Sequence, residues 1–469
     1  MIGQAETAHL VAAPSDQSAR LRIAAICGKT IFSSLLGLIV LTAIPYGTSE
    51  PWWKAAFVCC VCGLGALALI ENALSCSRRI AGWSLLLPLF TLVAFSLLQV
   101  VPSKAALPTI GTQAWTAISA DPNETRFVAL QLLALTVSAA LLFRYAREER
   151  RLRVLINVII GVAVASAIFG LLRQTMQHGE AFILPLKTDQ GYGQFINRNH
   201  FAFLMEMGFG LALGMIVGGG VKRERALIFV AALLPIWMAL VLSNSRGGLL
   251  AMLAQLIAGA LLFSFTFPPA AAGSSSLKIL SFVRLLPVRI ALLFVLLAGV
   301  VLGTVWIGGD RLVNRLDETQ EGSHPSAVSR NEIWGATWNL FKAHPVVGVG
   351  MGGYWIAISA HHNASGTMVP QEAHNDYLEL LASGGVIGAA IGVWFCVAFF
   401  KQARANLQSS NHFRRAASFA ASLGIVGVAV HSLFDFGLHK IVNALIFMAL
   451  IVIATNRSDS PNKPDVSEF

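Results

Sequence analysis

The chain has 469 residues, of which 55% are hydrophobic and only 12% are charged. Soluble domains carry about 25% charged residues, so this composition excludes disordered, collagen-like and coiled-coil proteins and argues strongly against a soluble enzyme. The formal net charge is +10. In a soluble protein this excess would indicate an acidic partner such as nucleic acid, whereas in a membrane protein it reports the orientation of the loops.

Apolar stretches long enough to cross a bilayer, about 20 residues each, recur along the whole chain. They predict an all-α, polytopic membrane protein with about 12 transmembrane helices. The expected spans cover residues 30–46, 55–70, 82–101, 127–143, 154–172, 201–218, 226–242, 247–267, 288–307, 377–400, 416–434 and 441–455. Residues 1–29 and 456–469 are expected to be tails, and residues 308–376 form a long loop between spans nine and ten.

The distribution of lysine and arginine predicts the orientation. Basic clusters such as 144–153 and 401–415 fall in alternate loops, which are the cytoplasmic ones under the positive-inside rule. Both termini are then cytoplasmic, the long loop is periplasmic, and the protein resides in a bacterial inner membrane. The basic excess lies on the cytoplasmic side and the outer face is net acidic, so no nucleic-acid partner is expected.

The long loop contains a predicted amphipathic helix. Ser329 and Glu332 have the spacing of a capping box, and Trp334 lies on the apolar face that follows. This helix is expected to lie on the membrane surface or against the bundle. Arg330 falls in its first turn, where the helix dipole disfavours a cation, which hints at an anionic partner.

A glycine-rich segment follows this helix. Residues 348–353 match G-x-G-x-x-G, but a dinucleotide site needs a preceding strand and a βαβ unit. We therefore interpret the segment as a flexible turn. The glycines at 384, 385, 388 and 392, in the tenth span, are expected to permit close helix packing.

Two more arginines and a histidine are expected on the same outer face as Arg330. Arg198 precedes the sixth span, Arg246 lies in a short turn at the start of the eighth, and His374 lies at the start of the tenth. Arginine forks suit phosphate oxygens, and imidazole titrates near neutral pH and can act as a general base. The plainer alternatives are interfacial arginines and a histidine that satisfies a helix end.

One further pair closes the eleventh span. His431 and Asp435 are four residues apart, which predicts neighbouring positions on one helix face and a structural role. No D-x-D element or cluster of histidine and cysteine ligands appears in the outer segments, so no metal and no cofactor are expected. Together Arg198, Arg246, Arg330 and His374 could hold a diphosphate and activate a nucleophile.

Several short motifs recur here in the order of a known family. They are N-R-N-H-F-A at 197–202, S-R-G-G at 245–248, Arg330 with Trp334, Pro345 with G-V-G at 348–350, H-N-D-Y-L at 374–378 and H-S-L-F-D at 431–435. This set resembles the O-antigen ligase and polymerase superfamily over roughly residues 194–444. The His-Ser-Leu-Phe-Asp-Phe and Asn-Arg-Asn-His elements slightly favour its exopolysaccharide polymerase-like members.

The resemblance implies an inverting, metal-independent membrane glycosyltransferase. Its donor would be a glycan on undecaprenyl diphosphate, and its acceptor would be a lipid A-core sugar or another lipid-linked glycan. By this likeness Arg246 and Arg330 bind the donor diphosphate, with help from Arg198, and His374 activates the acceptor hydroxyl. The supporting residues expected around them are Asn375, Asp376, His200, His431 and Asp435.

Other classes of protein fit the same composition. A secondary transporter or a lipid or glycan flippase also has about 12 spans, but its ionisable residues tend to lie at the membrane midplane and its halves tend to repeat. A scaffold subunit of a polysaccharide export complex would leave the arginines and His374 without a role. Membrane lipids, and export or chain-length proteins, are the further partners considered.

Overall fold

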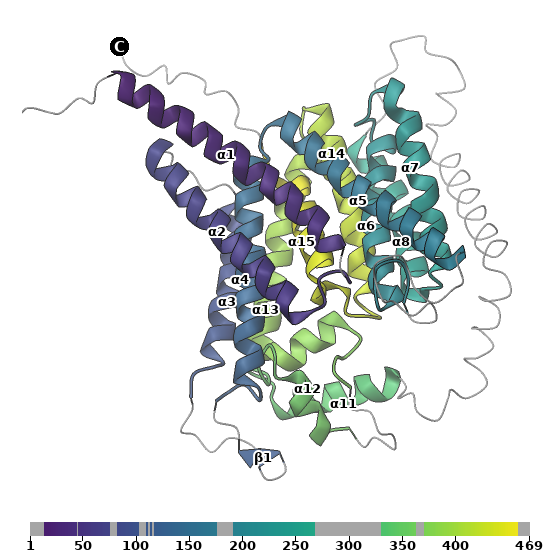
Figure 1. Ribbon diagram of the computed structural model, residues 1–469. Helices are drawn as coiled ribbons and strands as arrows, with labels where there is room; N and C mark the ends of the chain where they lie inside the picture. Colours follow the sequence, from purple (N-terminus) through teal and green to yellow (C-terminus); the bar gives the residue numbers. More distant parts are fainter. Residues whose placement is uncertain are drawn as a thin grey trace, which may run out of the picture.

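The computed structural model describes residues 14–44, 46–75, 82–102, 109–110, 113–114, 117–175, 191–267, 330–362 and 370–457 (Figure 1). The first half of this part contains α1 (Pro14–Ala43), α2 (Pro51–Ser75), α3 (Trp83–Leu98), α4 (Pro122–Tyr145), α5 (Glu149–Thr175), α6 (Arg198–Val217), α7 (Arg223–Leu242) and α8 (Arg246–Thr266). Between α3 and α4 lie two antiparallel strands of two residues each, β1 (Thr109–Ile110) and β2 (Gln113–Ala114).

The second half continues the helical pattern. It contains α11 (Arg330–Ala343), α12 (Tyr354–Ala357), η1 (Ile358–Ala360), α13 (Asp376–Leu407), α14 (His412–His431), η2 (Gly437–His439) and α15 (Ile441–Thr455). The described part of the chain is therefore almost entirely helical, as the composition predicts.

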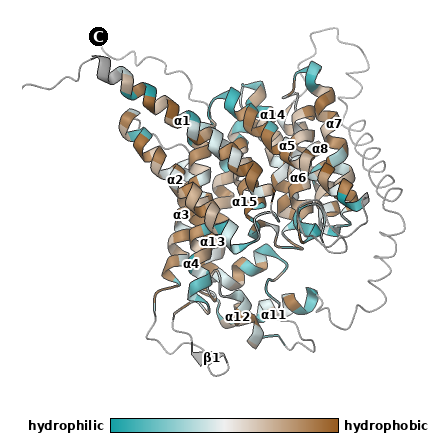
Figure 2. Cartoon of the chain, viewed as in Figure 1, coloured by the Kyte–Doolittle hydropathy of each residue, from teal (hydrophilic) through white to brown (hydrophobic). Residues whose placement is uncertain are grey.

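Nine of the described helices are long and apolar enough to cross a membrane, and α3 and α15 are shorter apolar helices. Each expected span within the described residues falls on one of these eleven helices. The expected ninth span, 288–307, lies outside the described residues, so the total of about 12 stays a prediction. Hydrophobic residues run along the helices and hydrophilic ones collect near their ends, which is the pattern of a multi-pass membrane protein (Figure 2).

The helices α6 and α14 lie at the centre of the bundle and pack against each other and against α8. Their contact depends on small residues. A Cβ atom on Gly214 of α6 would lie 2.3 Å from the backbone of Ala420 on α14, and one on Gly210 would lie 2.6 Å from the backbone of Gly424. Close helix packing through glycine therefore occurs here, where the two backbones approach each other directly.

The helix α13 is broken at Gly385, which has φ 61° and ψ −162°. The conformation requires glycine, and a Cβ at this position would lie 2.3 Å from the carbonyl oxygen of Val346. The expectation that Gly385 serves helix packing is therefore wrong. It instead lets the chain turn between a short first segment, which begins at Asp376, and the long remainder of the span.

A break inside a membrane helix exposes backbone groups that water cannot reach. In this protein the turn at residues 345–350 forms hydrogen bonds with these backbone groups. The amides of Val386 and Ile387 donate to the carbonyls of Pro345 and Val346, and the carbonyls of Ala382 and Ser383 accept from the amides of residues 349 and 350. Gln99, the C-cap residue of α3, also bonds to these groups, since its Nε2 donates to Val347 O (2.7 Å) and Ser383 O (3.0 Å).

The glycine-rich segment 348–353 is consequently a tightly bonded turn. Gly348 and Gly350 both have positive φ, and Cβ atoms on them would lie within 2.4 Å of Ser383 and 2.2 Å of Ser119 respectively. The prediction of a turn is confirmed, but the prediction that it is flexible is wrong, because the amides of residues 349 and 350 donate to carbonyls at the break in α13 and the Met351 amide donates to Gln99.

The helix α11 packs against α13 near the end of the bundle where the α13 segment begins (Figure 1). Its buried side is formed by Ile333, Ala336, Thr337 and Leu340, whereas Trp338 is 47% exposed. This confirms the amphipathic pattern and shows that the helix lies against the bundle. Ser329, the expected cap, lies outside the described residues.

Candidate functional site

The centre of the site is Asp435, which follows α14 and is completely buried. The helix ends at His431, and the chain then turns, with the amide of Asp435 donating to the carbonyl of His431 (3.1 Å). The prediction that His431 and Asp435 share a helix face is wrong, because the helix stops before it reaches Asp435. The two side chains join different clusters.

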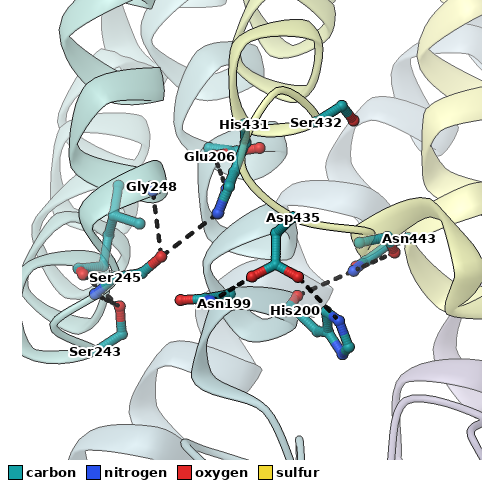
Figure 3. A network of polar contacts seen from close by, with 12 residues as sticks. Asn199, His200, Glu206, Ser243, Ser245, Gly248, His431, Ser432, Asp435 and Asn443 are labelled. Carbon is teal, nitrogen blue, oxygen red and sulfur yellow. Dashed lines mark hydrogen bonds and ion pairs between the residues drawn. The ribbon is translucent and has the colours of Figure 1, made fainter. Parts of the chain in front are cut away.

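The carboxylate of Asp435 contacts four side chains from three segments that are distant in sequence. Its Oδ2 accepts a hydrogen bond from the Asn199 side-chain amide and lies 3.5 Å from the Arg330 guanidinium. Its Oδ1 lies 3.5 Å from His374 Nδ1 and 3.7 Å from His200 Nε2. Figure 3 shows Asp435 between Asn199 and His200. One buried carboxylate thus connects α6, α11 and the start of α13.

The surroundings of Asp435 favour its charged form. Burial alone would raise the pKa of the carboxyl, but the polar contact with His374, the nearby His200 and the donated amide of Phe436 (2.9 Å) outweigh burial and hold the pKa below its usual range. Asp435 is therefore a fixed negative charge beneath two half-exposed groups, since the side chains of Arg330 and His374 are 44% and 32% exposed.

An aromatic ring separates the imidazoles of the site. The edge-on neighbours of Phe436 are His200 (4.7 Å between ring centroids), His374 (4.8 Å) and His439 (5.6 Å). The ring planes are tilted by 67° to 77°, which is the favoured edge-to-face arrangement. Phe436 thereby limits the orientations that the three histidines can adopt around Asp435.

The backbone around His374 is held on both sides. The amide of Ala373 donates to Glu379 Oε2 (2.8 Å), and its carbonyl accepts from Trp334 Nε1 (3.1 Å). His374 itself has φ 51°, a conformation that a non-glycine residue adopts only when its surroundings impose it. Asn375 then caps α13, with its side chain accepting from the amides of residues 377 and 378.

A second polar cluster lies beside His374. Asp376 Oδ2 accepts a hydrogen bond from the Ser432 hydroxyl (2.6 Å), and the Asp376 amide donates to the Ser432 carbonyl (2.9 Å). His439 Nε2 lies 3.7 Å from Asp376 Oδ1 and 3.5 Å from Glu379 Oε1. Ser432 thus connects the end of α14 to the start of α13, and the two acids face a third histidine.

The start of α8 contacts a separate buried cluster, which contains His431 and Glu206. Ser245 caps the helix by accepting from the Gly248 amide (3.2 Å), and its hydroxyl lies 3.5 Å from His431 Nε2. His431 Nδ1 contacts Glu206 Oε2 at 3.0 Å, and both side chains are buried (Figure 3). The His431 ring stacks on Phe203 at 4.0 Å. These contacts fix the turn that carries Arg246.

The structure places the sequence-predicted residues as follows. Arg246 begins α8 and is exposed, and His374 directly precedes the α13 cap, so the prediction that both lie at helix starts is confirmed. Arg198 begins α6, beside Asn199, which touches Asp435. Arg330, His374 and His200 converge on Asp435, whereas His431 belongs to the Glu206 pair.

Sequence reasoning did not identify several neighbours. Glu206 is not among the residues predicted for the site, although an isolated carboxylate in an apolar span is itself a signal of a buried polar contact. His439 was overlooked because it lies in the short connection to the last span, and Phe436 has no polar signature. Among the described residues, no group of three or more His, Cys, Asp or Glu side chains has the arrangement of a metal site.

Comparison with known proteins identifies one family. Residues 228–393 match the family model described as O-antigen ligase, which confirms the resemblance to that superfamily. The matched segment includes Arg246, Arg330 and His374 and ends before His431 and Asp435. None of the curated proteins compared with the chain matches it.

Proposed function

With the O-antigen ligase match as the premise, we propose that the chain is a membrane glycosyltransferase of the ligase or polymerase type. It transfers a glycan from undecaprenyl diphosphate to an acceptor sugar hydroxyl at the periplasmic face of the inner membrane. The observation that carries the proposal is the convergence of Arg330 and His374, with Asn199 and His200, on the buried carboxylate of Asp435.

The arginines neutralise the leaving group. A diphosphate departs readily once its developing charge is stabilised, and planar guanidinium groups can supply that charge without a metal ion. Arg246 and Arg330 are both exposed, and each begins its helix, so their side chains can reach a bound lipid. Arg198, at the start of α6, is a third donor-side cation in this proposal.

His374 accepts the proton of the acceptor. A proton on Nδ1 directed at Asp435 leaves the Nε2 lone pair available to the acceptor hydroxyl. The acceptor oxygen bonds to the anomeric carbon, the bond from that carbon to the diphosphate oxygen breaks with its electron pair, and the proton passes to Nε2. The 3.5 Å separation of Nδ1 from Oδ1 is longer than a standard hydrogen bond and is expected to shorten when the acceptor binds.

Loss of transfer by single variants tests this assignment. We expect Arg246→Ala, Arg330→Ala and His374→Ala each to lower glycan transfer at least about 100-fold while the protein still reaches the membrane. Matched controls are Arg223→Ala at the start of α7 and His412→Ala at the start of α14, the end of that helix opposite His431. Normal surface glycan in a strain that carries only His374→Ala would reject His374 as the base.

The glycan products of a strain that lacks this protein identify the acceptor. A single glycan repeat still attached to lipid A-core means that the lost enzyme is a polymerase, and long polymer accumulating on undecaprenyl diphosphate means that it is a ligase. Transfer of a labelled glycan by the purified protein in detergent, with no second compartment, would exclude transport as the sole activity. Failure of transfer in both acceptor classes would reject the proposed function.

A further inference from the structure

A groove runs along the outside of the bundle between α5 and α7. It has a volume of about 1260 Å³, and Ile156, Ile160, Val164 and Ile168 of α5 face Ile228 and Phe229 of α7 across it. The apolar part of the α5 lining spans twelve residue steps, from Ile156 to Ile168, or about 18 Å of helix. That length is slightly more than one half of a bilayer's hydrocarbon core, which is about 30 Å thick.

One end of the groove is polar. A second hollow, of about 370 Å³, is lined by six residues that also line the groove, so the two are continuous. These shared residues are Glu149, Arg153, Gly220, Val221, Lys222 and Phe413, of which Val221 and Gly220 belong to the turn before α7. The combined cavity thus has a polar mouth and an apolar channel.

The mouth lies at the end of the bundle opposite the candidate site. The helix α6 starts beside Asn199, at the site, and ends at Val217, next to the mouth, and α14 starts beside the mouth at His412 and ends at His431. Each helix has 20 residues and is about 30 Å long, which is the thickness of the hydrocarbon core. The mouth therefore lies in the leaflet opposite the site.

The charges at the mouth are predominantly positive. Arg153 is engaged by Glu149 (2.7 Å), lies 3.7 Å over the Phe413 ring and donates to the Gly220 carbonyl (3.3 Å). Lys222 lines both hollows and Arg225 lines the groove, and both side chains are exposed. Within the described residues neither side chain forms an ion pair, and the one acidic residue that lines the mouth, Glu149, pairs with Arg153.

We propose that this cavity binds one anionic phospholipid of the leaflet opposite the site. Lys222 and Arg225 bind the phosphate of the headgroup, and one acyl chain lies along the α5 face from Ile156 to Ile168. Charge complementarity favours this occupant over the chain's own apolar stretch 288–307, which carries Arg289 and no acidic residue. The proposal is independent of the transfer reaction.

The test measures lipid that remains bound to the full-length protein. The protein is purified in mild detergent, equilibrated with an equal mixture of phosphatidylglycerol and phosphatidylethanolamine, and examined by native mass spectrometry. Wild type is expected to retain one phosphatidylglycerol. Each basic residue at a membrane surface contributes about fivefold to the affinity for anionic lipid, so Lys222→Ala with Arg225→Ala should weaken retention roughly 30-fold.

Two further variants distinguish binding of the lipid headgroup from binding of its acyl chain. Arg223→Ala removes an exposed charge from the same helix end that does not line the groove, and it should retain the lipid like wild type. Gly161→Phe fills the groove, since no atom lies within 4 Å of a Cβ at this position, and it should displace the lipid without disturbing the packing of its helix. A monodisperse elution profile confirms that each variant is folded.

Three results would overturn the proposal. Wild type that retains no lipid would mean that the groove is filled by another segment of this chain. Equal retention of both phospholipids would mean general solvation by the bilayer. Equal retention by the double variant and by Arg223→Ala would mean that Lys222 and Arg225 bind no headgroup.

Discussion

Gln99 offers the sharpest test of how the broken helix is held. This side chain is 1% exposed, and it makes hydrogen bonds with three backbone groups of the turn and the break. Nε2 donates to Val347 O and Ser383 O, and Oε1 accepts from the Met351 amide (3.1 Å). Gln99→Leu keeps the volume of the side chain approximately and removes all three bonds.

The expected cost follows from those three groups. A buried backbone group that loses its partner costs about 1–3 kcal/mol. Two of the three bonds are only partly buried, so the lower value applies, and we expect Gln99→Leu to lower the free energy of unfolding by about 3 kcal/mol. Because the turn abuts the first segment of α13, transfer activity should fall as well.

Unfolding of the purified protein in mixed detergent micelles measures this difference. Gln402→Leu is the matched control, because the hydrogen bond that the Gln402 side chain makes with Ser84 in the described part of the chain is exposed. The control is expected to change stability by less than about 0.5 kcal/mol. If Gln99→Leu and Gln402→Leu unfolded at the same denaturant concentration, the hydrogen bonds of Gln99 would not be what holds the turn to the break.

Three further substitutions test other parts of the structure. Gly385→Ala places a Cβ against a carbonyl and forces a positive φ on alanine, so it should cost at least about 2 kcal/mol in the same unfolding assay, while Gly63→Ala, in open space on α2, should cost nothing. Glu206→Leu leaves His431 without its partner and should cost about 3–5 kcal/mol, and adding His431→Phe should recover part of that loss, which a double-mutant cycle measures. Burial raises the pKa of Glu372, so the folded state holds its proton to higher pH than the unfolded chain, and stability falls as pH rises from the unfolded pKa through the folded pKa. Glu372→Gln should therefore raise the melting temperature at pH 7 and leave it nearly unchanged near pH 4, and a constant difference across that range would contradict this account.

The positions of the helices were predictable because membrane insertion depends on local hydrophobicity. The expected span 201–218 and the observed α6 (Arg198–Val217) differ by a few residues at one end and by one at the other. The starts at Arg246 and His374 were equally visible, because Ser245 and Asn375 are preferred N-cap residues. In each case the signal lies within a few neighbouring residues.

The break in α13 was not predictable in this way. Its apolar sequence reads as one continuous span, and a glycine at 385 is compatible with either packing or a turn. What distinguishes them is the turn at residues 345–350, whose amides and carbonyls fill the break. These groups are backbone atoms, so the side-chain sequence carries little information about the pairing.

The same limit applies to the roles of Asp435 and His431. Their spacing of four residues predicts a shared helix face, but α14 ends between them, and each finds a partner more than 50 residues away in sequence. Sequence alone determined that this is a multi-pass membrane protein, where its described helices lie and which polar residues it carries at their ends. Only the tertiary structure decided which of those residues meet, because a buried charge takes its partner from whichever helix packs beside it, and that choice depends on the whole bundle.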